Sequence, residues 1–254
     1  MSFRIYQNIT RSMEEVGFEH PSIKWDHILL PITIMSSMFN YHKYNYLIMQ
    51  NYSSNNTAVM VVDPFNDFLS EGGKRWSRTK ETVIGVNLIE NLKKILSAGR
   101  SSGIKIVYVP HHNYEKGDFE DWKFLAPTHK GSLKYSLFEK GSWGGEFHPE
   151  LTPKQGDLIA QNHWTASGFA NTNLDFLLKL HNVDRVIITG MRANTCIDTT
   201  ARYAVELGYH TTLIKDTIAA YNWEEIKATV EVNFPNYGHA LISTKEFIDI
   251  CSKL

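Results

Sequence analysis

From Thr57 onward, short apolar runs alternate with segments whose apolar residues recur at helical spacing. The first run, Thr57–Asp63, is almost continuously apolar, which is typical of parallel strands that are buried on both faces. Strands that alternate with helices are connected by right-handed crossovers, which place helices on both faces of a parallel sheet. The pattern therefore predicts an α/β fold: a three-layer α/β/α domain around a central parallel sheet of about six strands.

The expected strands are Thr57–Asp63, Ile104–Val109, Asp157–Ala160, Arg185–Thr189, His210–Ile214 and Ala240–Ser243. The expected helices are Val83–Leu96, Asn173–Leu180, Ile197–Leu207, Glu224–Val232 and Lys245–Ser252. A long connection rich in glycine and aromatic residues, residues 111–156, separates the second strand from the third. Loops of this length in compact domains are usually functional, so we expect a functional role for this segment.

Residues 1–56 form a separate N-terminal extension in this interpretation, and residues 57–254 form the main domain. The extension is rich in Asn, Tyr, His and Met, lacks sustained periodicity and ends in the polar run 51–56. Its aromatic content is too high for a simply disordered segment. It is expected to pack on the main domain or on a neighbouring subunit, and a mere decoration of the domain is the open alternative.

The charge and cysteine content exclude several classes of partner. Lys and Arg number 26 against 27 Asp and Glu, so a general attraction to nucleic acid or to an anionic membrane is not expected. The strongest apolar window, Ile28–Met38, is about half as long as a membrane-spanning helix. Two cysteines without a secretory signal indicate a reduced, cytoplasmic protein without a disulfide. We therefore expect a small-molecule substrate.

Cys196 lies where the run Val183–Gly190 should turn into the helix Ile197–Leu207. At a helix N-terminus, unpaired N–H groups and the helix dipole favour an anion. This position predicts a thiol with a lowered pKa that acts as a nucleophile, with the same N–H groups holding a developing oxyanion. The competing interpretation is an ordinary buried cysteine.

Three chemically competent side chains follow expected strands. Asp63 ends the first strand, His163 lies just past the third, and Cys196 follows the fourth. The carboxyl ends of parallel strands share one edge of the sheet, so these residues can converge as base, charge-bearing partner and nucleophile. Taken singly, Asp63 can equally be a loop carboxylate and His163 a surface histidine.

The motifs at these strand ends together resemble those of the isochorismatase-like cysteine hydrolases. The resemblance extends from about Thr57 to the C-terminus. Its carriers are Val61–Phe68, His163–Phe169 with Thr172 and Leu174, and Gly190–Cys196 with Thr200.

The family uses an Asp–Lys–Cys triad, so the resemblance implies the roles of carboxylate for Asp63 and of nucleophile for Cys196. The chain departs from the pattern at the lysine, because His163 stands in that position. A histidine titrates near 6.5 and a lysine near 10, so this replacement would make the site sensitive to neutral pH. The alternative is that Gln161 or Asn162 takes the position and no cation is present.

The resemblance further implies a cis peptide bond between Met191 and Arg192 and an oxyanion hole formed by the backbone N–H groups of Thr195 and Cys196. Relatives are commonly dimers or tetramers, so a homo-oligomer is expected. No cofactor is implied.

Four further residues are candidates for substrate binding. Phe65, Trp164 and Phe169 are expected to line the pocket and Arg192 to meet a carboxylate, although aromatic residues beside turns are often part of the core. The glycine-rich run Lys140–Pro149 is a candidate lid.

Metal binding is not expected. His111 and His112 follow the second strand, and their spacing with His129 is not a recognisable ligand set.

The sequence therefore predicts a cysteine-dependent hydrolase that cleaves a non-peptide C–N bond of a small amide, ureide or carbamoyl compound through a covalent thioester. Two alternatives are an isochorismatase-type vinyl-ether hydrolase and a catalytically silent binding protein on the same fold.

Overall fold

The computed structural model describes residues 52–254. Most of the expected N-terminal extension, residues 1–56, lies outside the described residues. Of its last residues, Tyr52 is buried, and its hydroxyl forms a 2.7 Å hydrogen bond with Thr212 Oγ1. The packing of the domain therefore begins a few residues before Thr57.

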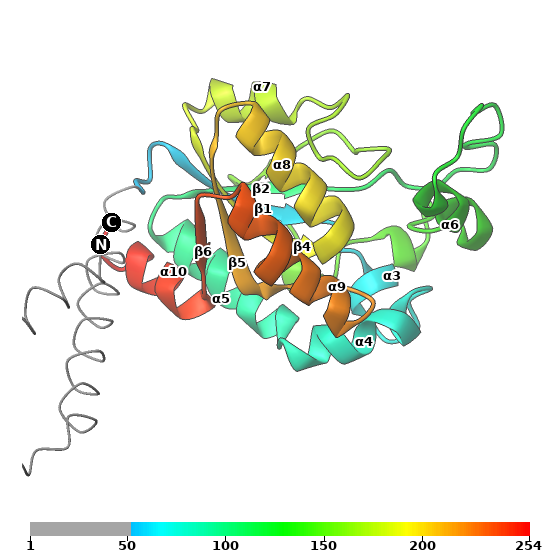
Figure 1. The fold of residues 1–254 in the computed structure, drawn as a ribbon, viewed down its shortest axis with the longest axis horizontal. Coiled ribbons are helices and arrows are strands. Elements are labelled where there is room, and N and C mark those ends of the chain that lie inside the picture. Colours follow the sequence, from blue (N-terminus) through cyan, green and yellow to red (C-terminus); the bar gives the residue numbers. More distant parts are fainter. Residues whose placement is uncertain (1–51) are drawn as a thin grey trace, which may run out of the picture. The chain divides into compact units, whose positions relative to one another are not determined.

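The described residues contain the expected parallel sheet, flanked by helices (Figure 1). The strand order is β3-β2-β1-β4-β5-β6, and every neighbouring pair is parallel. The strands are β1 (Thr57–Val62), β2 (Lys105–Val109), β3 (Leu158–Ile159), β4 (Arg185–Met191), β5 (His210–Ala219) and β6 (Ala240–Ile242). The predicted fold class is thus confirmed.

The helices and helical turns that bear on the site and on the core follow the same alternation. They are α3 (Asn66–Leu69), α4 (Trp76–Gly85), α5 (Leu88–Ser101), α6 (Pro127–Tyr135), α7 (Leu174–Leu180), the π-helical turn η3 (Ala193–Ile197), α8 (Asp198–Glu206), α9 (Trp223–Lys227), the π-helical turn η4 (Ala228–Asn233) and α10 (Thr244–Cys251). Within residues 52–254, no helix has the length and apolar character needed to cross a membrane.

The core forms because successive side chains of each strand point to opposite faces of the sheet. Ala58, Met60 and Val62 of β1 belong to one apolar cluster with residues of α7 and α8. Val59 points to the other face, where Gly99 lets α5 approach closely: an added Cβ would lie 3.0 Å from Ile106 Cδ1 and 3.9 Å from Val59 Cγ2. Both faces of β1 are therefore covered, which explains its continuous apolar sequence.

The prediction of one continuous helix at Val83–Leu96 is wrong. The chain forms two helices there, α4 and α5, and Asn87 stands between them in the left-handed region at φ 53°. Asparagine tolerates this conformation better than most residues. The apolar spacing runs across the break, because both helices bury a face, and so it conceals the turn.

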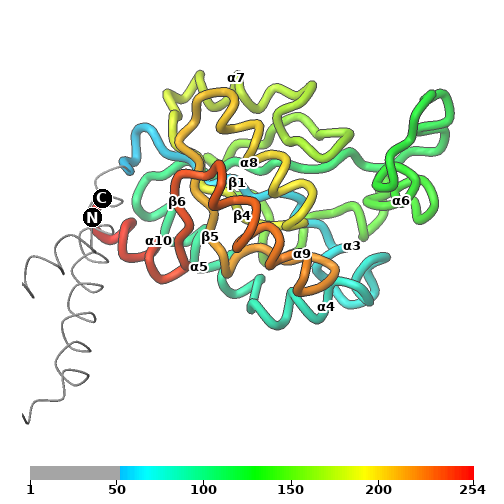
Figure 2. Tube along the Cα trace, in the orientation of Figure 1, coloured from blue at the N-terminus to red at the C-terminus, as the bar shows by residue number. Residues whose placement is uncertain are grey.

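The long connection between β2 and β3 is partly ordered into α6 and short helical turns. Figure 2 shows this segment, in green, extending away from the sheet to α6 and returning. The helix expected at Glu224–Val232 is divided into α9 and the π-helical turn η4.

Candidate active site

The sheet reverses its direction of growth between β1 and β4. The chain adds β2 and β3 on one side of β1, and then places β4, β5 and β6 on the other side. Open α/β sheets bind ligands outside the carboxyl ends of the strands at such a switch point. Asp63 and Cys196 both follow strands that border it.

Asp63 directly follows β1 and is fully buried. Its backbone has a φ of 50° and its N–H donates to the carbonyl of Val109 at the end of β2. One carboxylate oxygen, Oδ1, lies 3.1 Å from Nε2 of His163. The other, Oδ2, is buried and has no hydrogen-bond partner among the described residues. This oxygen is therefore available to accept a proton.

His163 reaches Asp63 because pairing between β2 and β3 resumes beyond the two-residue strand β3. The backbone N–H of His163 donates to Pro110 O at 2.9 Å, and His112 N–H donates to His163 O at 2.8 Å. These bonds form an isolated parallel bridge between His111 and His163. The imidazole is thereby held at the end of β1, and it is fully buried.

The hydrogen bonds of His163 determine where its protons lie. Nδ1 is 2.6 Å from the carbonyl oxygen of Thr165, which can only accept, so Nδ1 carries a proton. Nε2 faces the Asp63 carboxylate, so a second proton must lie between Nε2 and Oδ1. Burial lowers the pKa of His163, but the charge of Asp63 and the hydrogen bonds outweigh it and raise the pKa above 6.5. The arrangement therefore favours an imidazolium–carboxylate pair.

The neighbouring histidine is neutral by the same reasoning. His111 lies edge-on to His163, with ring centroids 5.0 Å apart. Burial, followed by the charge of His163, lowers the pKa of His111 to about 4. The pair of histidines thus holds one positive charge, on the ring that touches Asp63.

Asn162 and Gln161, the two alternatives to His163, form hydrogen bonds with residues other than Asp63. Asn162 Nδ2 donates to His111 O at 2.9 Å and to Asn113 Oδ1 at 3.0 Å. Gln161 is exposed, and its N–H donates to Asn173 Oδ1. Among these three, His163 is the side chain that contacts Asp63.

Cys196 is a buried free thiol in η3, immediately beyond β4. The peptide bond between Met191 and Arg192, just before this turn, is cis. The expected lowering of the thiol pKa is wrong: burial, and next the charge of Asp63, raise the pKa of Cys196 well above its usual value of 9.0. Arg192 acts in the opposite direction, but its effect is smaller. The thiol is therefore protonated at rest.

The turn η3 also supplies the backbone groups expected to hold an oxyanion. Thr195 N–H lies 3.2 Å from the carbonyl oxygen of Arg192, and Ile197 N–H donates to the same oxygen at 3.0 Å. An oxyanion at Thr195 would therefore share a donor that is already engaged. The side chain of Asn194, in the same turn, has a buried Oδ1 without a hydrogen-bond partner in residues 52–254.

The expected pocket residues lie in different environments. Phe65 is 2% exposed and stacks on Phe138 at 4.6 Å, and Phe169 is 5% exposed and packs against Tyr209. Trp164 is 36% exposed and stacks on the His112 ring at 3.5 Å. Two of these aromatic residues thus belong to the core, and Trp164 reaches the surface.

Arg192 is held beside the cysteine turn by residues that follow β5. Its guanidinium carbon lies 3.7 Å from the centre of the Tyr221 ring, and Nη1 is 3.8 Å from Glu225 Oε2. Tyr221 was not among the predicted site residues, because β5 was expected to end at Ile214, whereas it continues to Ala219. The true end of β5 would have marked Tyr221 by the same strand-end rule as Asp63.

A metal site is not formed by the histidines after β2. His112 instead contacts Asp118, with Nε2 2.8 Å from Oδ2. In the part of the chain that the structure describes, no group of three or more His, Cys, Asp or Glu side chains is arranged to hold a metal ion.

Comparison with known proteins shows which proteins this chain resembles in sequence. The model of the Isochorismatase domain matches residues 57–246. The ureidoacrylate amidohydrolase RutB of Agrobacterium fabrum is 26% identical over 208 residues, which cover 78% of this chain and 90% of that protein.

Solved structures give the same result for the fold. A cysteine hydrolase from Pseudomonas syringae pv. phaseolicola has a TM-score of 0.68 and 23% identity, over 80% of this chain and 95% of that chain. An isochorismatase-like hydrolase from Alkaliphilus metalliredigens has a TM-score of 0.62 and 26% identity, over 78% of this chain and 98% of that chain.

Proposed function

The chain belongs to the isochorismatase family, and from this premise we propose that it is a cysteine-dependent hydrolase of a non-peptide C–N bond in a small amide, ureide or carbamoyl compound. Relatives named ureidoacrylate amidohydrolase support a substrate of the ureide class. The observation that carries the proposal is the buried Asp63 carboxylate, which contacts His163 through one oxygen and leaves the other free beside Cys196.

The proposed first step is a proton transfer from sulfur to oxygen. Asp63 Oδ2 accepts the proton of the Cys196 thiol as the sulfur attacks the substrate carbonyl carbon. Because the resting thiol has a raised pKa, deprotonation and attack are coupled, and the thiolate does not accumulate beforehand. The imidazolium of His163 balances the negative charge that the pair of Asp63 and Cys196 carries throughout.

The proposed second step releases the amine. The tetrahedral oxyanion is held by the N–H groups of Thr195 and Cys196, and the C–N bond breaks as protonated Asp63 gives its proton to the leaving nitrogen. Water then attacks the thioester, with Asp63 again as the base, and gives a carboxylic or carbamic acid and free Cys196. In sum, one amide and one water yield one acid and one amine or ammonia.

An ammonia-release assay tests this proposal. Purified protein is incubated with a panel of small amides and ureides, with Cys196→Ala as the blank and Cys251→Ala as the matched control for the other cysteine. We expect release by the wild type and by Cys251→Ala, and a loss of at least about a thousandfold in Cys196→Ala, because the nucleophile is absent. Ammonia release that persists in Cys196→Ala would contradict a thiol nucleophile, and a wild type that releases no ammonia from any compound of the panel would favour the vinyl-ether alternative.

We further propose that residues 57–254 form the hydrolase domain and that the protein acts in the cytoplasm as a homo-oligomer. Two buried, unpaired cysteines support the reducing compartment. Light scattering on the eluting protein measures the oligomeric state, and a monomer at all concentrations would contradict this part.

A further inference from the structure

Arg75 is a buried cation without a counter-ion in the described residues. It is 7% exposed, at the residue that precedes α4, and its Nε has no hydrogen-bond partner. No carboxylate of residues 52–254 lies within ion-pair distance of it. The hydroxyl of Tyr135 is a hydrogen-bonding partner of the Arg75 side chain, but it is neutral, so the buried positive charge lacks an ionic partner.

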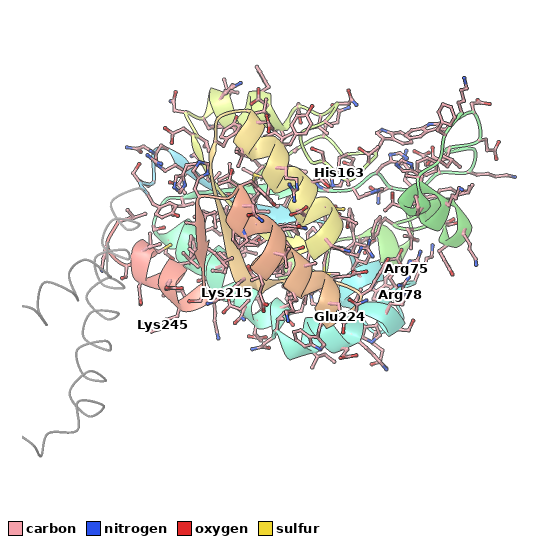
Figure 3. The ribbon with its side chains drawn as sticks, in the orientation of Figure 1. Arg75, Arg78, His163, Lys215, Glu224 and Lys245 are labelled. Atoms are coloured by element: carbon pink, nitrogen blue, oxygen red, sulfur yellow. The ribbon has the colours of Figure 1, made fainter. Side chains whose placement is uncertain are left out.

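Two tyrosine rings lie near the Arg75 guanidinium, and one of them also contacts two further arginines. Its guanidinium carbon lies 3.9 Å from the centre of the Tyr135 ring and 5.9 Å from that of Tyr221. Arg78 and Arg192 lie over the same Tyr221 ring at 3.8 Å and 3.7 Å. Figure 3 labels Arg75 and Arg78 close together near the start of α4.

The charges in this cluster do not balance. Arg75, Arg78 and Arg192 contribute three positive charges, and Glu225, 3.8 Å from Arg192, is the carboxylate that the structure places in ion-pair distance of them. The aromatic rings attract a guanidinium but carry no net charge. The cluster is therefore short of negative charge and can bind an anion through planar guanidinium groups, which suit a carboxylate.

The cluster adjoins the cysteine turn. Arg192 is in the cis peptide bond that precedes η3, and its charge acts on the Cys196 thiol. Tyr221 contacts Arg192 directly and lies within reach of Arg75. Arg192 and Tyr221 thus connect Arg75 to the turn that carries Cys196.

We propose that Arg75, together with Arg192, binds a carboxylate of the substrate, so that the substrate is a small amido or ureido acid and not a neutral amide. This inference rests on the proposed function for the position of the scissile bond. Arg75 is the specificity-determining residue because it supplies the guanidinium that has no other ionic partner.

Binding to Cys196→Ala tests the proposal without turnover. Calorimetry compares N-carbamoyl-β-alanine with n-propylurea, which has the ureido group but no carboxylate. We expect N-carbamoyl-β-alanine to bind at least about tenfold more tightly than n-propylurea. Arg75→Gln in the same background should lower the affinity for the acid by at least about tenfold and the affinity for the neutral urea by less than about twofold. Lys80→Gln removes an exposed charge of the same helix, α4, and should change neither by more than about twofold.

Equal or undetectable binding of the two probes, or an equal loss of both in Arg75→Gln, would overturn the proposal. If the glutamine variant does not fold, Arg75→Lys decides: it keeps the charge but loses the planar fork, so a selective loss of the acid supports the proposal and unchanged affinity overturns it. Arg75-dependent binding without hydrolysis by the wild type would contradict the proposed function and leave this inference intact.

Discussion

The contact between Asp63 and His163 gives a prediction about how stability depends on pH. We consider Asp63→Asn, which removes the charge but keeps the shape of the side chain. Asn Nδ2 can donate to His163 Nε2, while Nδ1 still donates to the carbonyl of Thr165. The variant therefore has a complete hydrogen-bond arrangement with a neutral imidazole, and we expect it to fold.

The size of the shift in the pKa of His163 follows from the geometry of its contact with Asp63. At an effective dielectric constant of about 20, two unit charges 3.1 Å apart attract by about 5 kcal/mol. Burial opposes the charged form of His163, so the net rise in its pKa is smaller than this attraction implies. In Asp63→Asn the attraction is absent, and burial, the largest single influence, opposes only the backbone hydrogen bonds of His163, so the pKa of His163 should fall below 6.5.

The contribution of His163 to the free energy of unfolding should then change with pH in opposite directions in the wild type and in Asp63→Asn. In the wild type the raised pKa means that His163 contributes stability below the unfolded value near 6.5, and that this contribution is lost as pH rises through the folded pKa. In Asp63→Asn the lowered pKa means that stability is present above that value and is lost as pH falls. One proton changes the free energy of unfolding by at most about 1.4 kcal/mol per pH unit.

Urea unfolding of both proteins between about pH 5.5 and about pH 8 measures this difference. The change in unfolding free energy between them should vary by about 1 to 2 kcal/mol across the range. Ionisable groups that do not contact Asp63 or His163 contribute equally to both proteins and cancel in the difference. Asp249→Asn, on an exposed part of α10, is the control for loss of a carboxylate. Its plot of unfolding free energy against pH should run parallel to that of the wild type. Parallel curves for the wild type and Asp63→Asn would refute the charged His163 and with it the cation of the site.

Two further predictions concern the turn before Cys196 and the identity of the cation. Gly190→Ala should destabilise the protein by more than about 4 kcal/mol in urea unfolding, because Gly190 has φ 111° and an added Cβ would overlap the Val62 carbonyl. Gly208→Ala, at φ 89° in open space, should cost only about 1 to 2 kcal/mol, and equal losses would argue against the overlap. In His163→Lys, the alkaline decline of kcat/KM that deprotonation of His163 causes should move toward pH 10, and an unchanged alkaline limb would contradict a catalytic charge at this position.

The sequence was sufficient for the features that depend on periodicity. The apolar run of β1 predicted a buried parallel strand with Asp63 at its end, and the β-branched run before Gly190 predicted the strand that precedes Cys196. Both follow from local spacing. The alternation of elements indicates a parallel sheet with crossover connections, but the order of its strands, and with it the switch point between β1 and β4, comes from the structure.

The features that the sequence did not provide depend on contacts between distant segments. The convergence of Asp63 and His163 was expected from their places after strands, but β3 has only two residues, and the backbone pairing beyond it that holds His163 against Asp63 is shown by no local pattern. The prediction of a lowered pKa for the Cys196 thiol was wrong for a related reason. The helix-terminus rule describes the backbone near Cys196, but burial and the Asp63 carboxylate come from the rest of the fold and have the larger effect.

The raised thiol pKa and the paired Asp63 carboxylate are two consequences of one charge balance. A negative charge on Asp63 opposes a negative charge on Cys196, so the two side chains together hold one negative charge and one movable proton. Transfer of that proton from sulfur to Oδ2 leaves the total unchanged, and the single positive charge on His163 balances it in both states. In the proposed mechanism the buried site therefore activates the thiol without creating an additional unpaired charge, which would be costly at this depth.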